Sequence, residues 1–82
     1  MNNWFVYIVR CSNDSLYTGI TTDIERRMKQ HNAGKGAAYT RSHRPVELVY
    51  QEDVTSRSEA SIRESELKKL TKQEKELLVN QL

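Results

Sequence analysis

Apolar positions along the chain fall into short runs separated by turn-forming residues, and three of these runs predict strands. The run at residues 4–9 is almost continuously apolar and rich in aromatic and β-branched side chains, which is typical of a strand covered on both faces. A turn cluster at residues 12–15 leads to a returning strand at 16–21, so the two strands form a hairpin. Pro45 precedes a third strand at 46–51, where apolar and polar positions alternate in part.

The remaining periodic segments predict three helices. The first begins at a capping residue among positions 21–23 and runs to about Ala33, with Gly34 as its stop signal. Residues 35–44 then form a basic, glycine-containing loop. A second helix starts at residue 56 or 58 and extends to about residue 70.

The last helix begins at a capping box, since Thr71 is followed three residues later by Glu74. It carries Leu77, Leu78 and Leu82. The predicted order is therefore β-β-α-β-α-α. With three strands and three helices, the 82 residues are expected to form one domain, an α/β sandwich in which helices cover a small sheet.

Polar side chains interrupt the apolar face of the first predicted helix. Ile24, Met28 and His31 follow i, i+4, i+7 spacing and share one face, and Arg27 flanks His31. A lone histidine on such a face is more often a core residue than a functional one. Arg27 changes the balance, because a guanidinium at the border of a buried face stays charged and needs an anionic partner.

The second predicted helix has the same irregularity. Ala60, Glu64 and Leu67 share one face, which places a carboxylate within the stripe expected to face the core. A buried carboxylate must be neutralised, paired or bound to a cation. Two interpretations stay open: a salt bridge to Arg27 or Arg63, or a ligand for a hard divalent cation such as Mg²⁺, which needs only one or two carboxylates.

Two tyrosines in the hairpin share a face only if the register allows it. A hairpin loop of two or four residues would place Tyr7 and Tyr17 on opposite faces, whereas three or five residues would place them on the same face. The sequence leaves this open. Gly19, inside the second strand, marks a bulge or the close approach of another backbone or a ligand.

Charge is distributed unevenly along the chain. Residues 22–45 carry six basic and two acidic side chains, whereas residues 46–82 carry six basic and eight acidic ones. The basic zone suits a phosphate-bearing polymer, but charge alone favours a solvated helix face beside a basic loop. The single cysteine, Cys11, excludes an internal disulfide. No apolar run approaches the ~18 residues that a membrane helix needs, so a cytoplasmic location without membrane association is expected.

These residues together resemble the GIY-YIG nuclease family over nearly the whole chain, and in detail its small stand-alone bacterial members. Residues 5–7 and 17–19 match the two strand motifs, with Phe5 in place of glycine and Thr18 in place of isoleucine. The helix signature and the later Ala-then-Glu signature are matched by Asp23, Ile24, Arg27, Met28, His31, Ala60 and Glu64. The resemblance implies the GIY-YIG fold, with a small three-stranded antiparallel sheet flanked by three helices.

The resemblance further implies a metal-dependent endonuclease or phosphodiesterase acting on nucleic acid, with DNA favoured over RNA. Glu64 would hold one Mg²⁺ or Mn²⁺, and Tyr7 would act as general base or orient the attacking water. Tyr17 would support Tyr7 by hydrogen bonding. Arg27 would stabilise charge on the scissile phosphate, and His31 would assist proton transfer or position a neighbouring group.

Substrate contacts are expected mainly from the basic loop. Lys35 and Arg41 would contact phosphates, Tyr39 a base, and Gly19 would allow close approach. Asn80 is only a candidate for the family's late polar residue. Two alternatives are a nucleic-acid-binding module without efficient cleavage, and a structural or interaction domain. A protein partner cannot be named from the sequence.

Overall fold

The sheet is built around its first strand. The structure is a computed structural model, in which residues 3–81 are described. β1 (Trp4–Arg10) lies at the centre and pairs antiparallel with β2 (Leu16–Thr21) on one side and β3 (Glu47–Val54) on the other. Four successive β1 residues, 6–9, are buried, which confirms a strand covered on both faces.

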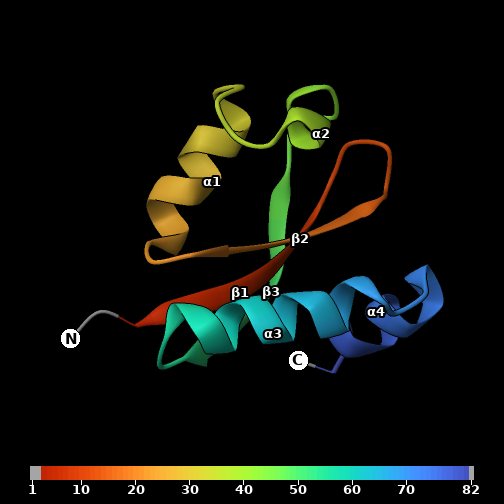
Figure 1. Ribbon diagram of the computed structural model, residues 1–82. Coiled ribbons are helices and arrows are strands. Elements are labelled where there is room, and N and C mark those ends of the chain that lie inside the picture. The colour runs from red at the N-terminus through yellow and green to blue at the C-terminus, as the bar shows by residue number, and fades with distance from the viewer. Residues whose placement is uncertain (1–2, 82) are drawn as a thin grey trace.

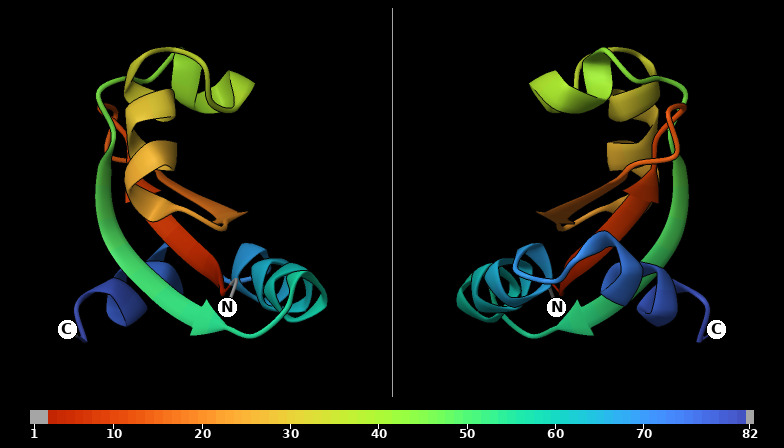
Figure 2. Two further views of the ribbon diagram at one scale, coloured as in Figure 1. Left: turned by 90° about the vertical axis from the view of Figure 1, so that its left-hand side faces the viewer. Right: turned by 90° about the vertical axis from the view of Figure 1, so that its right-hand side faces the viewer.

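The helices lie in two groups on opposite faces of this sheet (Figure 1). α1 (Ile24–Asn32) and α2 (Ala38–Arg41) cover one face, and α3 (Arg57–Lys68) and α4 (Lys72–Val79) cover the other. Figure 2 shows that the sheet curves between the two groups. No helix within residues 3–81 is long and apolar enough to cross a membrane.

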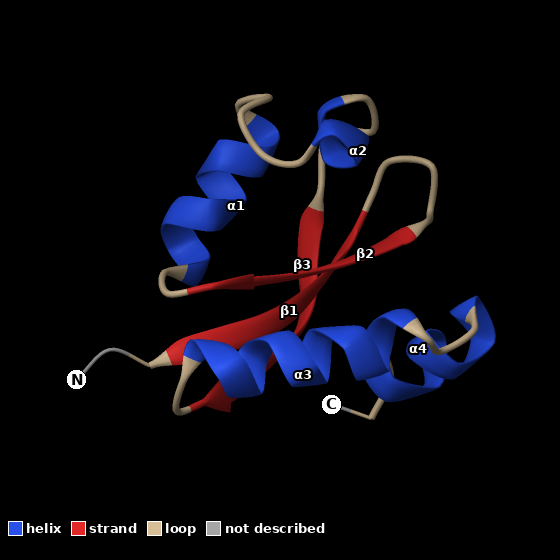
Figure 3. Ribbon diagram, in the orientation of Figure 1, coloured by secondary structure: helices blue, strands red, loops and turns tan. Residues whose placement is uncertain are grey.

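The alternation of β1 side chains divides the interior into two apolar clusters. Val6 and Ile8 pack towards α3 and α4, whereas Tyr7 and Val9 belong to the cluster that includes side chains of α1. The predicted sandwich with its three-stranded antiparallel sheet is therefore confirmed (Figure 3).

Several element bounds differ from the prediction. The basic loop contains the one-turn helix α2, which its glycines and charges did not indicate. β3 continues to Val54 instead of ending near residue 51, because its outer half still pairs with β1. Leu82, assigned to the last helix, lies outside the described residues.

The predicted capping residues begin the three longer helices. The side chain of Asp23 accepts a hydrogen bond from the Arg26 amide at the start of α1, and Ser56 caps α3 in the same way. Thr71 and Glu74 form the expected capping box of α4.

The hairpin register places both tyrosines on one face. Tyr7 lies opposite Gly19, and five residues, 11–15, connect the paired residues Arg10 and Leu16. This is one of the two odd loop lengths that keep Tyr7 and Tyr17 together.

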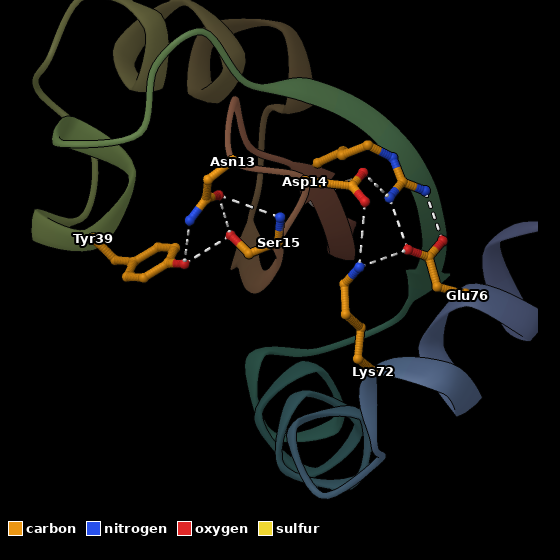
Figure 4. A network of polar contacts seen from close by, with 7 residues as sticks. Asn13, Asp14, Ser15, Tyr39, Lys72 and Glu76 are labelled. Atoms are coloured by element: carbon orange, nitrogen blue, oxygen red, sulfur yellow. Dashed lines mark hydrogen bonds and ion pairs between the residues drawn. The ribbon is translucent and has the colours of Figure 1, made fainter.

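Side chains fix this loop to distant elements on both sides (Figure 4). Arg10 donates to Asp14 at 2.9 Å and to both carboxylate oxygens of Glu76 on α4, at 2.8 and 2.7 Å. On the other side, Ser15 Oγ lies 2.7 Å from the hydroxyl of Tyr39 on α2. The hairpin loop therefore contacts α2 through Ser15 and α4 through Asp14, whose carboxylate lies 3.4 Å from Lys72 Nζ.

Candidate functional site

A chain of hydrogen bonds on the α1 side of the sheet joins three elements. The Tyr7 hydroxyl on β1 lies 2.8 Å from His31 Nε2 on α1. Arg27, one helical turn before His31, donates from Nε to the same hydroxyl at 3.3 Å. On its other side, His31 Nδ1 lies 2.8 Å from Thr40 Oγ1 on α2. Tyr7, His31 and Thr40 are almost completely buried.

Two glycines allow this chain to form. A Cβ atom on Gly19 would lie 2.5 Å from Tyr7 Oη, and one on Gly36 would overlap the His31 ring. The backbones of β2 and of the segment before α2 therefore press directly on the phenol and the imidazole. The sequence predicted a bulge or the close approach of another backbone or a ligand at Gly19; the group that approaches it is instead the side chain of Tyr7.

Tyr17 lies beside the buried pair but is partly exposed. Its ring meets the His31 ring edge-on, with centroids 5.9 Å apart, and stacks on Tyr39 at 6.3 Å. The four residues predicted around the proton-transfer centre, Tyr7, Tyr17, Arg27 and His31, are thus brought together by β1, β2 and α1.

Burial keeps both proton-carrying groups of the site neutral near pH 7. It raises the pKa of Tyr7 above 10.0, an effect that Arg27 partly opposes through its hydrogen bond and its charge. Burial also lowers the pKa of His31 below 6.5, and the nearby Arg27 charge adds to that decrease. A neutral phenol thus faces a neutral imidazole, which can accept a proton.

Glu64 stands apart from this hydrogen-bonded chain, on α3. Its side chain is 23% exposed and forms an ion pair with Lys68 at 3.4 Å. Arg63, a partner considered from the sequence, instead binds Glu52, and Arg27 binds Tyr7 and Gln30. The salt bridge to Arg27 or Arg63, one of the two interpretations left open by the sequence, is therefore not formed.

The Glu64 carboxylate still acts on the site electrostatically, since its negative charge contributes, as the smallest of several causes, to the raised pKa of Tyr7. Among residues 3–81, no three potential metal-ligating side chains gather at one place. A partly exposed single carboxylate suits Mg²⁺ or Mn²⁺, which can complete their coordination with water and substrate oxygens. The residues present thus fit one hydrated divalent ion and no cage of protein ligands.

The other residues predicted to contact the substrate differ in how freely a substrate could reach them. Lys35 and Arg41 are exposed, in the segment that leads into and forms α2. Tyr39 is 42% exposed, but its ring is stacked between Tyr17 and His43, with the His43 ring 4.3 Å away. Asn80 ends α4 as its exposed C-cap residue.

Sequence reasoning missed two members of the site. Gly36 was noticed only as part of a basic loop, although a glycine next to a predicted site is a signal of close packing. Thr40 had no signal, because nothing in its spacing relates it to His31 before the chain is folded.

Comparison with known proteins agrees with the fold. Residues 3–77 match the family described as the GIY-YIG catalytic domain. The chain belongs to the GIY-YIG family.

Within this family the chain is similar to proteins named UPF0213. It is 52% identical to a UPF0213 protein of Haloquadratum walsbyi, covering 99% of this chain and 92% of the relative. It is 56% identical to one of Staphylococcus haemolyticus, covering 92% of each. The solution structure of a UPF0213 protein from Bacillus halodurans is 47% identical, with a TM-score of 0.61 over 95% of this chain and 83% of that chain.

Proposed function

We propose that this protein is a metal-dependent phosphodiesterase that cleaves nucleic acid as an endonuclease, with DNA favoured over RNA. The observation that carries this proposal is the hydrogen-bonded chain from Arg27 through Tyr7 to His31, formed by motif residues of a GIY-YIG catalytic domain. It supplies a proton acceptor and a fixed positive charge next to each other, which are the groups that phosphodiester hydrolysis requires.

The proton path solves the problem that a tyrosine poses as a base. With an unperturbed pKa of about 10, a free phenol is a poor base at neutral pH. Here the attacking water gives its proton to Tyr7 Oη while the Tyr7 proton passes to His31 Nε2. The water oxygen bonds to phosphorus, the bond to the leaving oxygen breaks, and that oxygen takes up a proton from solvent. The imidazole holds the proton only transiently, because burial and the Arg27 charge lower its pKa, and it returns the proton through Tyr7 to solvent after the leaving group departs, so a free phenolate never needs to accumulate.

The other site residues act around this path. Arg27 places its guanidinium beside Tyr7, where it stabilises negative charge on the phosphate. Tyr17, partly exposed on the same face, orients the water at the mouth of the site. Glu64 would hold the divalent ion that the family implies, and the bound ion would neutralise charge on the leaving oxygen.

Substrate binding is assigned to the exposed cations near α2. Lys35 and Arg41 would contact backbone phosphates, and binding is then expected to weaken steeply as salt rises. The Tyr39 ring stacks closely on His43 but is 42% exposed, so a base would contact the part of the ring that His43 leaves open. Contacts made mainly to the backbone predict little dependence on base sequence.

A plasmid-nicking assay with Mg²⁺ or Mn²⁺ tests the proposal. Nicking should vanish in EDTA and in Glu64→Gln, whereas Glu66→Gln, a change at an exposed position on the same helix, should leave it intact. Tyr7→Phe should lower the rate by ~10²–10⁴, the usual contribution of a general acid–base group. Equal nicking by the wild type and Glu64→Gln would identify a contaminating nuclease and refute the assignment.

A second function is favoured by one observation. Tyr7 is only 1% exposed, which restricts the access of water to its hydroxyl. A domain with this site closed would bind nucleic acid without cleaving it efficiently. Salt-sensitive binding of DNA with no nicking in either metal would support this alternative over the nuclease.

A further inference from the structure

The hydrogen-bonded chain around His31 has a direction, which follows from counting protons. Thr40 has one hydroxyl proton, and its Oγ1 lies 2.9 Å from the Ala37 carbonyl oxygen, which can only accept. With that proton donated to Ala37, Thr40 Oγ1 must accept from its other neighbour, His31 Nδ1, 2.8 Å away. The imidazole proton is therefore on Nδ1.

The opposite side of the imidazole gives the same answer. Arg27 Nε can only donate to Tyr7 Oη, so the phenol oxygen already accepts one hydrogen bond. If His31 Nε2 also donated to it, His31 could not accept the phenol proton, and the proton of this buried residue would lose its acceptor at 2.8 Å. With Nε2 as acceptor, the Arg27, Tyr7, His31 and Thr40 donors of this hydrogen-bonded network all have a partner.

Thr40 is held in place by contacts that do not involve His31. The Tyr39 hydroxyl next to it lies 2.7 Å from Ser15 Oγ, and the Ser12 amide donates to the His43 carbonyl at 3.0 Å. These contacts fix α2 to the hairpin loop on both sides of Thr40. Its oxygen is thus presented to His31 by the fold and does not adapt to the imidazole.

We propose that Thr40 is a positioning residue that fixes His31 in its Nδ1–H tautomer and so keeps Nε2 free to receive the Tyr7 proton. The effect on rate rests on the proposed nuclease function, whereas the tautomer does not. The groups that face His31 are Tyr7 from β1, Tyr17 from β2, Arg27 from its own helix and Thr40 from α2. Among these four, only Thr40 contacts Nδ1 through a hydrogen bond.

Long-range ¹H–¹⁵N NMR of the labelled protein tests this assignment, since it distinguishes a protonated ring nitrogen from an unprotonated one. The chain has two histidines, and His43 is an internal control because its Nδ1 lies 2.7 Å from the Tyr39 carbonyl, which requires the same tautomer without Thr40. A His43→Gln variant assigns the two sets of signals. At a pH where both rings are neutral, His31 of the wild type should show a protonated Nδ1 and an unprotonated Nε2.

Matched variants then identify the cause. Thr40→Val keeps the shape but removes the acceptor, so His31 should shift towards its Nε2–H tautomer while His43 does not change. Thr40→Ser should restore the wild-type spectrum. Wild-type protein with Nε2–H, or a folded Thr40→Val with unchanged Nδ1–H, would overturn the proposal. The wild-type spectrum decides the tautomer even if Thr40→Val does not fold, and Thr40→Ala then serves as the variant without a hydroxyl.

Nicking kinetics provide the functional readout. Thr40→Val should lower kcat at least tenfold with KM unchanged, because it alters proton transfer and not substrate binding, and Thr40→Ser should recover most of the rate. A wild type that shows the predicted tautomer but does not nick would refute the nuclease function alone. A Thr40→Val variant with an altered tautomer and a wild-type kcat would refute the positioning role alone.

Discussion

Gly19→Ala offers a direct test of how tightly β2 packs against Tyr7. The added methyl carbon would lie 2.5 Å from Tyr7 Oη and 2.6 Å from Cζ. Carbon atoms in good contact are about 3.5–4.0 Å apart, so the end of the ring must move by about 1 Å. It has little room to move, because the hydroxyl is also held by His31 and Arg27.

The expected cost follows from two opposing effects. Overpacking a filled core costs ~1–3 kcal/mol, whereas replacing a strand glycine by alanine returns ~0.5–1 kcal/mol of backbone entropy. The net loss is centred on about 1 kcal/mol, within a range of ~0–2.5 kcal/mol. For a domain of this size it lowers Tm by ~4–8 °C per kcal/mol, which thermal unfolding followed by circular dichroism resolves.

A double-mutant cycle shows whether the Tyr7 ring is the cause. In a Tyr7→Leu background, which removes both atoms that the methyl group would meet, Gly19→Ala should become neutral or slightly stabilising. In Tyr7→Phe, which removes only the hydroxyl, its cost should be intermediate. If Gly19→Ala lowered Tm equally in all backgrounds, or in none, the close approach would not be what requires glycine here.

Three further predictions concern stability. Asp23→Ala removes the N-cap of α1 and should cost ~1 kcal/mol in urea unfolding, whereas Asp53→Ala, at an exposed position on β3, should cost little. The Arg10 guanidinium holds the pKa of Glu76 at about 2, below its ordinary 4.5, so the stability from this pair should be lost as pH falls from 4.5 towards 2. Unfolding of Glu76→Gln should be less acid-sensitive in that window. Since burial lowers the pKa of His31, the unfolded chain binds its proton more readily, and stability should also fall as pH drops below about 6.5; a His31→Gln variant without this decrease would agree, and an unchanged pH profile would contradict it.

The sequence predicted the elements well because their signals are local. The continuous apolar run of β1 and the Thr71–Glu74 capping box act through neighbours in the chain, and both appear in the structure. The unusual polar positions on helix faces singled out His31, which is buried between Tyr7 and Thr40, and Glu64, which is partly exposed on α3. The spacing within one helix was sufficient to bring Arg27 and His31 together.

What the sequence could not supply depends on contacts between distant segments. The hairpin register was open until the five-residue loop fixed it, and only then did Tyr7 and Tyr17 share a face. The pairing of Arg63 with Glu52 depends on how α3 lies across β3 and has no local signal. Thr40 acquires its contact with His31 only after α2 has docked on the hairpin.

The attachment of α2 also has a kinetic consequence. A four-residue helix has no stability of its own, so it persists only through its attachments to the hairpin, which are the contacts of Tyr39 with Ser15 and the neighbouring rings and the Ser12–His43 hydrogen bond. This segment can therefore open and close many times while the sheet and the three longer helices remain intact. Amide hydrogens near Thr40 should exchange with deuterium faster than those of β1. The time for which His31 keeps its hydrogen bond to Thr40 is then set by the opening of the Tyr39 contacts at the surface and not by global unfolding of the domain.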